Sequence, residues 1–285
     1  MSIEASASPN AREAQYWNSA ATKSWSEGHE PMDRMLAGLT QVAIDLAAPK
    51  PGERVLDIGC GSGTTLLELA ARVGPGGHVL GADIATTSVE RARQRIAQAG
   101  FAQADAVLAD MSTHEFAPRS FDLAFSRLGV MFFADPTATF AKLHGAMKPD
   151  GRLTFIVFRK PQENPWSTAP AAALGDLLPR PVPPGPEEPG MFSWADPSRV
   201  RRILEGAGFR EIALTPHDPA MQIGADVAEA VDFAMRFGPL ARAASIGALK
   251  EPEAVRAGLE AFFGKHGSAQ GIVLPGAIWI VQARA

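Results

Sequence analysis

RVLDIGCGSG, residues 54–63, decides the fold of this chain. Its first half is an apolar run with β-branched residues, which is typical of a buried strand. Its second half holds Gly59, Gly61 and Gly63, and glycines in such a turn let the backbone approach a ligand because no Cβ occupies the space. From Thr64 onward, apolar residues recur every three or four positions, which predicts a helix. Strand, glycine turn and helix form the first unit of a parallel α/β sheet that binds ligands at the carboxyl ends of its strands.

The same alternation of short strands and amphipathic helices continues along the chain, as expected for an α/β fold. Further strands are predicted at 78–83, 106–109, 121–126, 152–158, 210–215 and 277–284. The helix after the second strand carries Val89, Ala92 and Ile96 on one face and ends at Gly100. The chain is therefore predicted to be a doubly wound α/β protein.

Changes of composition mark the expected domain boundaries. The core covers 51–160, and 196–217 together with 271–285 complete its sheet. Three segments are interpreted as lids over this core: 1–50, 161–195 and 218–270. The second lid is rich in proline and is expected to be mostly loop. The third has the apolar spacing of helices and is too long for an ordinary connection.

Composition and charge exclude several classes of protein. The 285 residues are 46% apolar and 20% charged, which is typical of a globular protein. Lys and Arg number 27 against 31 Asp and Glu, so the chain lacks the basic surplus expected for nucleic-acid binding. The single cysteine, Cys60, excludes an internal disulfide and a thiolate metal cluster, and fits a reducing compartment. Without a long apolar run, the chain is expected to be cytoplasmic and to have no membrane partner.

Polar side chains stand at the predicted carboxyl ends of the strands. The set consists of Asp57 on the first strand, Asp83 on the second, Asp110 after the third and Ser126 on the fourth. Because the carboxyl ends of parallel strands meet at one edge of a sheet, these side chains are expected to line one crevice. Asp83 lies 20 residues after Gly63, the offset at which a carboxylate accepts hydrogen bonds from both hydroxyls of a ribose.

These motifs resemble the class I S-adenosylmethionine-dependent methyltransferases, and within them the small-molecule branch of the ubiquinone and menaquinone C-methyltransferases. The resemblance is carried by VLDIGCGSG, GADIA, LADM, FDLAFSRLGVMFF and LHGAMKPDGRL. It covers 54–160 and extends more loosely to 196–214 and to the last strand. It implies a seven-stranded, mostly parallel sheet with an antiparallel last strand, and S-adenosyl-L-methionine as the cofactor.

The resemblance also implies how the turn meets the cofactor. Gly59 and Gly61 would pass under its methionine part, and Asp57 would order the turn near the ammonium group. Cys60 is expected to be a small packed residue of the same turn, at the border of the cofactor. Ser126 would line the pocket near the methionine part.

On the nucleoside side, the resemblance implies that Asp83 holds the ribose hydroxyls and that Ile84 packs on adenine. Asp110, beside Met111, would accept a hydrogen bond from the adenine amino group. In the same family the N-terminal segment folds over the cofactor, which makes Trp17 and Trp25 candidate walls of the pocket.

Other classes are weighed against this interpretation. A nicotinamide-dependent reductase would place glycine or alanine at the sixth position of a fingerprint starting at Gly59, where this chain has Thr64. A protein that binds S-adenosylmethionine without transferring its methyl group would carry the same cofactor residues, and only formation of S-adenosylhomocysteine separates the two. Asn164-Pro165-Trp166 matches half of a motif of amino-group DNA methyltransferases. It follows the fifth strand instead of the fourth and lacks the second proline, so it is set aside.

No catalytic base stands out in the sequence. Histidine titrates near neutral pH, and the candidates are His29, in the N-terminal lid, and His217, after the sixth strand. Arg127 is a candidate partner for an acidic substrate. Metal-dependent catechol-type enzymes carry an aspartate at the end of the fourth strand, where this chain has Ser126, so no catalytic metal is expected.

The predicted function is transfer of a methyl group to a small, partly apolar acceptor at oxygen, nitrogen or carbon. Because the sulfonium is already a good leaving group, the protein mainly aligns the reactants and excludes water. The lids are expected to choose the acceptor, since they are rich in aromatic side chains such as Trp166 and Phe233. A homodimer is compatible with the sequence.

Overall fold

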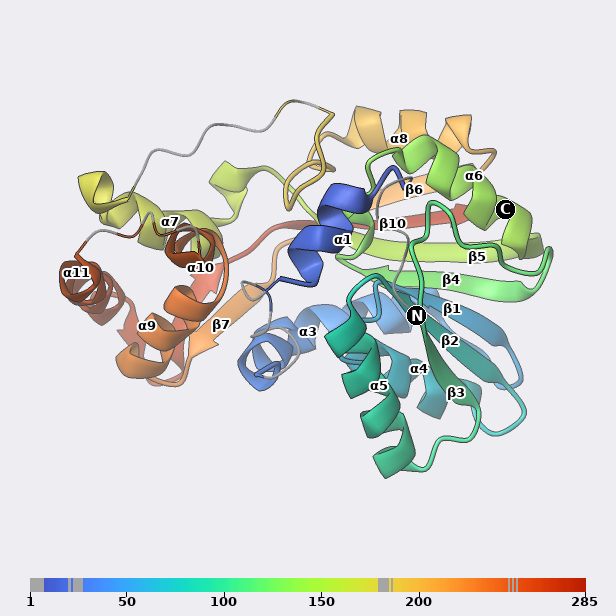
Figure 1. Ribbon diagram of the computed structural model, residues 1–285, viewed down its shortest axis with the longest axis horizontal. Helices are drawn as coiled ribbons and strands as arrows, with labels where there is room; N and C mark the ends of the chain where they lie inside the picture. Colours follow the sequence, from blue (N-terminus) through green and yellow to red (C-terminus); the bar gives the residue numbers. More distant parts are fainter. Residues whose placement is uncertain are drawn as a thin grey trace.

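A seven-stranded sheet forms the core of the computed structural model, which describes residues 8–19, 22, 28–178, 185, 187–245, 247, 249 and 251–285. The strands are β1 (Arg54–Ile58), β2 (His78–Asp83), β3 (Ala104–Leu108), β4 (Phe121–Arg127), β5 (Met147–Phe158), β6 (Arg210–His217) and β10 (Ile278–Arg284). Their order is β3-β2-β1-β4-β5-β10-β6 (Figure 1). Neighbours are parallel except that β10 runs antiparallel to both β5 and β6. The predicted mostly parallel sheet with an antiparallel last strand is confirmed.

Helices cover both faces of the sheet (Figure 1). One face carries α3 (Glu30–Ala47), α4 (Thr64–Val73) and α5 (Thr86–Ala99), and the other carries α6 (Pro136–Ala146) and α8 (Pro197–Gly206). Each helix turns an apolar stripe to the strands, as α4 does with Leu66, Leu69 and Val73, all of which are buried. This arrangement is the doubly wound α/β fold that the sequence predicts.

β1 and β4 are neighbours in the middle of the sheet, and the chain turns away from them in opposite directions. A sheet of this kind opens a crevice at the carboxyl ends of such a strand pair. The loops that follow the two strands approach closely there. A Cβ on Gly59, just after β1, would stand 2.8 Å from the Cα of Gly129, just after β4. The floor of the crevice is therefore bare backbone.

Residues 219–276 form a small unit between β6 and β10, which we call the lid. It contains β7 (Ala220–Gly224), α9 (Val227–Arg236), α10 (Pro239–Ser245), α11 (Pro252–Gly264), β8 (Gly267–Ser268) and β9 (Gly271–Pro275). The strands pair in the order β7-β9-β8. The prediction of a wholly helical segment is wrong for β7 and β8, and β9 pairs with β7 instead of joining the core sheet. From Ala220 to Ile223 exposed and buried residues alternate, but an alternation of four residues is too short to identify a strand.

A narrow neck, a buried asparagine and the packing of β7 against α3 join the lid to the core. At the neck, the Gly276 N–H donates to the Pro219 carbonyl at 2.9 Å. Asn164 precedes α7 (Pro165–Ala173), which packs against α11. The Asn164 amide oxygen accepts from the Ala277 N–H at 2.9 Å and from the Trp166 indole N–H at 3.1 Å, and its amide nitrogen donates to the Ala277 carbonyl at 3.0 Å. The tripeptide set aside in the sequence therefore anchors structure.

Candidate functional site

The three glycines of the turn adopt left-handed backbone conformations. The φ angles of Gly59, Gly61 and Gly63 are +67°, +54° and +89°. Any side chain is strained in this region, which explains the residue type. The space around them differs, because a Cβ on Gly59 would collide with Gly129 whereas a Cβ on Gly61 would have no atom within 4 Å. The turn is packed on one side and open on the other.

Asp57 lies under the turn as a fully buried carboxyl group. Its Oδ2 accepts from the Thr65 hydroxyl at 2.6 Å, whereas its Oδ1 has no hydrogen-bond partner in the described part of the chain. Burial raises the pKa of Asp57 to about 7, although the Thr65 hydrogen bond and the charge of Arg127 oppose this. A cationic donor would satisfy the free oxygen and favour the ionised carboxylate.

Asp83 ties the end of β2 to the glycine turn. One carboxylate oxygen accepts from the Gly61 N–H and the other from the Ala85 N–H, each at 2.8 Å. Burial raises the pKa of Asp83, although hydrogen bonds from backbone N–H groups oppose the shift. A carboxylate offers about four acceptor positions. Asp83 therefore keeps capacity for further donors, such as the hydroxyls of a ribose.

The N-terminal segment closes over Asp110. This carboxylate accepts from the Asn10 amide at 2.7 Å, from the N–H and hydroxyl of Ser112 at 2.8 Å each, and from the Ser8 hydroxyl. Burial alone would raise the pKa of Asp110, but the hydrogen bonds from Ser8 and Ser112 outweigh it and lower the pKa. The Asn10 amide oxygen accepts from the Ala134 N–H at 2.8 Å. Asn10 thus connects the loops after β3 and β4.

α1 (Ala11–Trp17) continues this segment across the strand ends (Figure 1). Its last residue, Trp17, packs edge-on against Phe132, with ring centroids 5.2 Å apart. The next residue, Asn18, donates its amide to the Ile84 carbonyl at 3.0 Å. The segment therefore covers the loops after β2 and β4. Trp25, the other predicted wall of the pocket, lies outside the described residues.

Three other predicted residues are buried in the walls of the crevice. The Ser126 hydroxyl donates to the Ile58 carbonyl at 2.7 Å and accepts from the Gly129 N–H at 3.2 Å, so it joins β1 to the loop after β4. Cys60 is buried, and burial raises the pKa of its thiol well above the usual value. The thiol therefore stays protonated and unreactive. Met111 is buried as well.

A charged cluster that the sequence did not predict lies on the other side of the turn. Asp33, on α3, accepts from the Thr64 hydroxyl at 2.6 Å and lies 3.3 Å from a guanidinium nitrogen of Arg127. The Arg95 guanidinium is 3.7 Å from the same carboxylate and donates to the Thr64 hydroxyl at 2.8 Å. Nδ1 of His29 is 3.2 Å from Asp33. The one feature of the sequence that indicates this cluster is the four-residue spacing between His29 and Asp33.

His217 lies on the same edge of the sheet but away from the crevice. It ends β6, and β10 and β5 separate β6 from β4. At about 4.8 Å per strand, His217 is roughly 14 Å from the end of β4. Of the two histidine candidates, the structure brings only His29 next to the turn.

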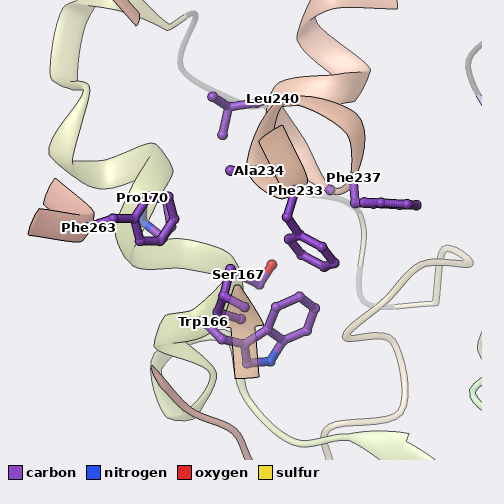
Figure 2. A pocket seen from close by; sticks show the side chains of 10 residues that line it. Trp166, Ser167, Pro170, Phe233, Ala234, Phe237, Leu240 and Phe263 are labelled. Carbon is purple, nitrogen blue, oxygen red and sulfur yellow. The ribbon is translucent and has the colours of Figure 1, made fainter. Parts of the chain in front are cut away.

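The aromatic side chains of the lid and α7 pack around a small cavity (Figure 2). Trp166 and Phe233 face each other across it, and Phe263 and Leu240 contribute to its walls. Its volume is about 20 Å³, which is room for about one water molecule. None of the predicted cofactor residues lines it. These side chains pack against one another, and Trp166 also contacts Phe158 of β5, so they continue the hydrophobic core of the sheet.

Two features are absent from the described residues. No three His, Cys, Asp or Glu side chains in that part of the chain gather as a metal-binding group. None of its helices combines the length and the apolar character needed to cross a bilayer.

Comparisons with known proteins agree with this geometry. Residues 49–179 match the family described as a methyltransferase domain. Nocamycin O-methyltransferase of Saccharothrix syringae is 31% identical over 198 residues, which cover 66% of this chain and 69% of that protein. Aklanonic acid methyltransferase of a Streptomyces species is 33% identical over 191 residues, covering 64% and 83%. The solved structure of the YcgJ protein from Bacillus subtilis shares the fold, with a TM-score of 0.57 at 16% identity over 87% of this chain and 98% of that one.

Proposed function

This chain belongs to the S-adenosylmethionine-dependent methyltransferases, and on that premise we propose which residues hold the cofactor and what kind of acceptor is methylated. The cofactor supplies a methyl group on a positively charged sulfur. The residues of the chain bind and orient the two reactants and keep water away.

One observation carries the assignment of the cofactor site. Asp83, which is hydrogen bonded to the open turn at Gly61, and Asp57, which is buried beneath the same turn, both have acceptor capacity to spare. The unpartnered Oδ1 of Asp57 suits the ammonium group of the methionine part. The free positions on Asp83 suit the ribose hydroxyls, and its bond to the Gly61 N–H fixes it beside the turn. An amino acid joined to a ribose needs these two kinds of partner close together.

The nucleoside end is assigned to the loops after β2 and β3. Ile84 and Met111 flank adenine in this proposal, and Asp110 accepts from its amino group. The Asn10 amide already donates to Asp110, so the amide and the adenine amino group would share one carboxylate. Trp25 stays a predicted wall of the pocket.

Two residues are proposed to border the methionine part without bonding it. The Ser126 hydroxyl is engaged by the Ile58 carbonyl. The Cys60 thiol is buried and uncharged. Both therefore contribute shape and leave the polar contacts to Asp57 and the backbone of the turn.

The acceptor is proposed to be a small, partly apolar molecule. Two relatives are named for nocamycin and aklanonic acid, and the lid, which is rich in apolar side chains, is proposed to cover the acceptor. The net charge of −4 argues against a nucleic-acid substrate, and the single cysteine fits the cytoplasm. A homodimer stays a prediction, which light scattering on the purified protein tests.

Isothermal titration calorimetry tests the cofactor site. S-adenosylmethionine and S-adenosylhomocysteine should bind and NAD should not. Asp83→Ala should weaken binding by about tenfold or more, because it removes two charge-assisted hydrogen bonds worth about 1.5–3 kcal/mol each. Asp83→Asn, which keeps an acceptor oxygen, should lie between wild type and Asp83→Ala, and circular dichroism checks that the fold persists.

Binding of NAD, with no binding of either nucleoside at millimolar concentration, would refute the assignment. Formation of S-adenosylhomocysteine on a panel of metabolites then separates methyl transfer from cofactor binding alone.

A further inference from the structure

His29 is a buried imidazole whose nitrogens are not satisfied. Only 8% of the residue is exposed, and neither Nδ1 nor Nε2 makes a hydrogen bond within the described part of the chain. Nδ1 is 3.2 Å from Asp33 Oδ2, which is close enough to pair, but the two groups are not well aligned. Buried polar atoms nearly always have partners, so an open one indicates a missing ligand or a reacting group.

Asp33 places this imidazole beside the glycine turn and the end of β4. One of its oxygens accepts from the hydroxyl of Thr64, the residue that follows Gly63, at 2.6 Å. The other lies 3.3 Å from the guanidinium of Arg127, the last residue of β4. His29 is therefore linked through one side chain to the first residue of α4, directly after the glycine turn, and to the last residue of β4.

Asp33 is held in a fixed position beside the imidazole. Its carboxylate contacts Thr64 on α4, Arg95 on α5 and Arg127 on β4, so three elements fix its position. A carboxylate next to Nδ1 favours the tautomer that carries its proton there, which leaves the lone pair on Nε2. A hydrogen-bond donor on a bound ligand is the partner that Nε2 lacks.

We propose that His29, positioned by Asp33, is the catalytic base, and that the methyl acceptor is a weakly acidic hydroxyl group, a phenol or an enol, on an apolar body. This inference rests on the methyl transfer proposed above and names its acceptor class. A carboxylic acid is ionised near neutral pH and would bring no proton to Nε2. His217 is three strands away from β4 and does not reach the same atoms.

Proton, methyl group and electrons balance in one step. Nε2 of His29 takes the hydroxyl proton as the acceptor oxygen forms its bond to the methyl carbon. The carbon–sulfur bond breaks, its electron pair stays on the sulfur, and the positive charge passes to the imidazolium. Asp33 stabilises the imidazolium, as a carboxylate beside a catalytic histidine does. The proton is released to water afterwards.

NMR of the full chain with nitrogen-15-labelled histidine tests the proposal without knowledge of the natural acceptor. The protein is saturated with S-adenosylhomocysteine, and His29→Gln identifies the two His29 signals. Three probes share one apolar ring system: 2-naphthol, 2-naphthoate and naphthalene. Neutral His29 should carry its proton on Nδ1, and its Nε2 signal should move with 2-naphthol only.

A neutral His29 with its proton on Nε2, or an Nε2 signal that 2-naphthol leaves unmoved, overturns the proposal. Asp33→Asn presents an amide that can donate to Nδ1, so it should transfer the ring proton to Nε2. An unchanged tautomer removes Asp33 from its positioning role. His266→Gln, at the exposed end of α11, is the matched control and should leave the His29 signals in place.

Calorimetry on the same samples separates this inference from the proposed function. S-adenosylhomocysteine should bind wild type and His29→Gln with affinities within about twofold of each other. If it does and the NMR result fails, the base assignment is wrong and the cofactor site stands. If wild type does not bind it at all, the proposed function itself is wrong.

Discussion

The glycine turn and the lid cavity are two small spaces of one molecule, built in opposite ways. At the turn, Gly61 leaves room for atoms that the chain does not supply, and an oxygen of Asp57 has no partner among the described residues. Between the lid and α7, Trp166, Phe233 and their neighbours fill the space until only about 20 Å³ remains. The turn is prepared for a polar ligand, whereas the lid is packed like a protein interior.

This difference indicates a division of roles. A ligand can occupy the space at Gly61 without moving the backbone. A ligand larger than a water molecule enters the lid cavity only if aromatic side chains move. We therefore expect changes in the lid to affect the acceptor and changes in the turn to affect the cofactor.

Replacement of 219–276 by a short linker is the change with the largest expected effect. Because the Pro219 carbonyl and the Gly276 N–H are hydrogen bonded, a few residues can join the two ends while β6 and β10 stay paired. Methylation of the natural acceptor should be abolished, since the proposed site would lose the segment that we expect to shield it from water. Cofactor binding should remain measurable by calorimetry. Methylation at the original rate, or long RNA as a better acceptor than any metabolite, would contradict the role given to the lid.

Asn164→Ala should destabilise the protein and leave cofactor binding at the glycine turn unchanged. It removes three buried hydrogen bonds and leaves the backbone of Ala277 and the indole of Trp166 without partners. The expected loss is about 3 kcal/mol in the free energy of unfolding, measured by urea titration. Thr168→Ala, which removes only long hydroxyl contacts on the same helix, should cost less than about 1 kcal/mol. A comparable loss in cofactor affinity would show that the two regions are not independent.

Gly61→Ala should weaken cofactor binding and have a smaller effect on the stability of the fold. The new Cβ meets no protein atom, so the fold should lose only about 1–2 kcal/mol from the strained backbone. The same Cβ fills the proposed path of the cofactor, and affinity should fall roughly 10- to 100-fold, as overpacking costs about 1–3 kcal/mol. Gly145→Ala, at an exposed helical position with free space, is the control: it should leave cofactor affinity unchanged and stabilise the fold by up to about 1 kcal/mol. Unchanged affinity in Gly61→Ala would place the cofactor elsewhere.

The pH dependence of cofactor binding is the smallest and most specific of these effects. Burial raises the pKa of Asp57 to about 7, so the free protein holds a proton there at lower pH. The ammonium of the cofactor requires the ionised form. Affinity should therefore rise by up to about tenfold per pH unit as the pH approaches 7, and level off above it. Calorimetry in buffers of different ionisation enthalpy should detect release of one proton, and Asp57→Asn should abolish it.

The same group makes the opposite contribution to folding. A raised pKa means that the folded state binds the Asp57 proton more tightly than the unfolded chain does. Its stabilising contribution is therefore fully present at low pH and is lost as the pH rises through about 7. Thermal melting should show that the melting temperature of Asp57→Asn rises relative to that of wild type as the pH increases. If the melting temperatures of the two proteins change with pH in parallel, Asp57 is already ionised in the free protein.

The sequence predicted the turn better than its surroundings, for physical reasons. A left-handed backbone selects glycine, and a strand end in a parallel sheet has a fixed place, so Gly61 and Asp83 could be read locally. Asn10 meets Asp110 across 100 residues, and no local pattern indicates such a pairing. The same holds for Asp33, whose partners Thr64 and Arg127 lie on other elements.

The strands of the lid were not predicted, for a different reason. β7 alternates buried and exposed residues over only four positions, and its partner β9 lies more than forty residues later in the chain. The intervening helices have apolar faces that look alike whether they cover a ligand or one another. Their packing against α7 depends on tertiary contacts that the local sequence does not indicate. The aromatic residues therefore suggested more room for an acceptor than the structure has.

The neck between Pro219 and Gly276 has a consequence for how such a protein can diverge. The chain leaves the sheet and returns to it at hydrogen-bonded backbone atoms, so the pairing of β6 with β10 is insensitive to the length and sequence of the excursion. Insertions, deletions or the exchange of a whole segment at this point would leave the catalytic half of the gene untouched. Descendants of one ancestor can in this way keep a single methyl donor while they acquire new acceptors.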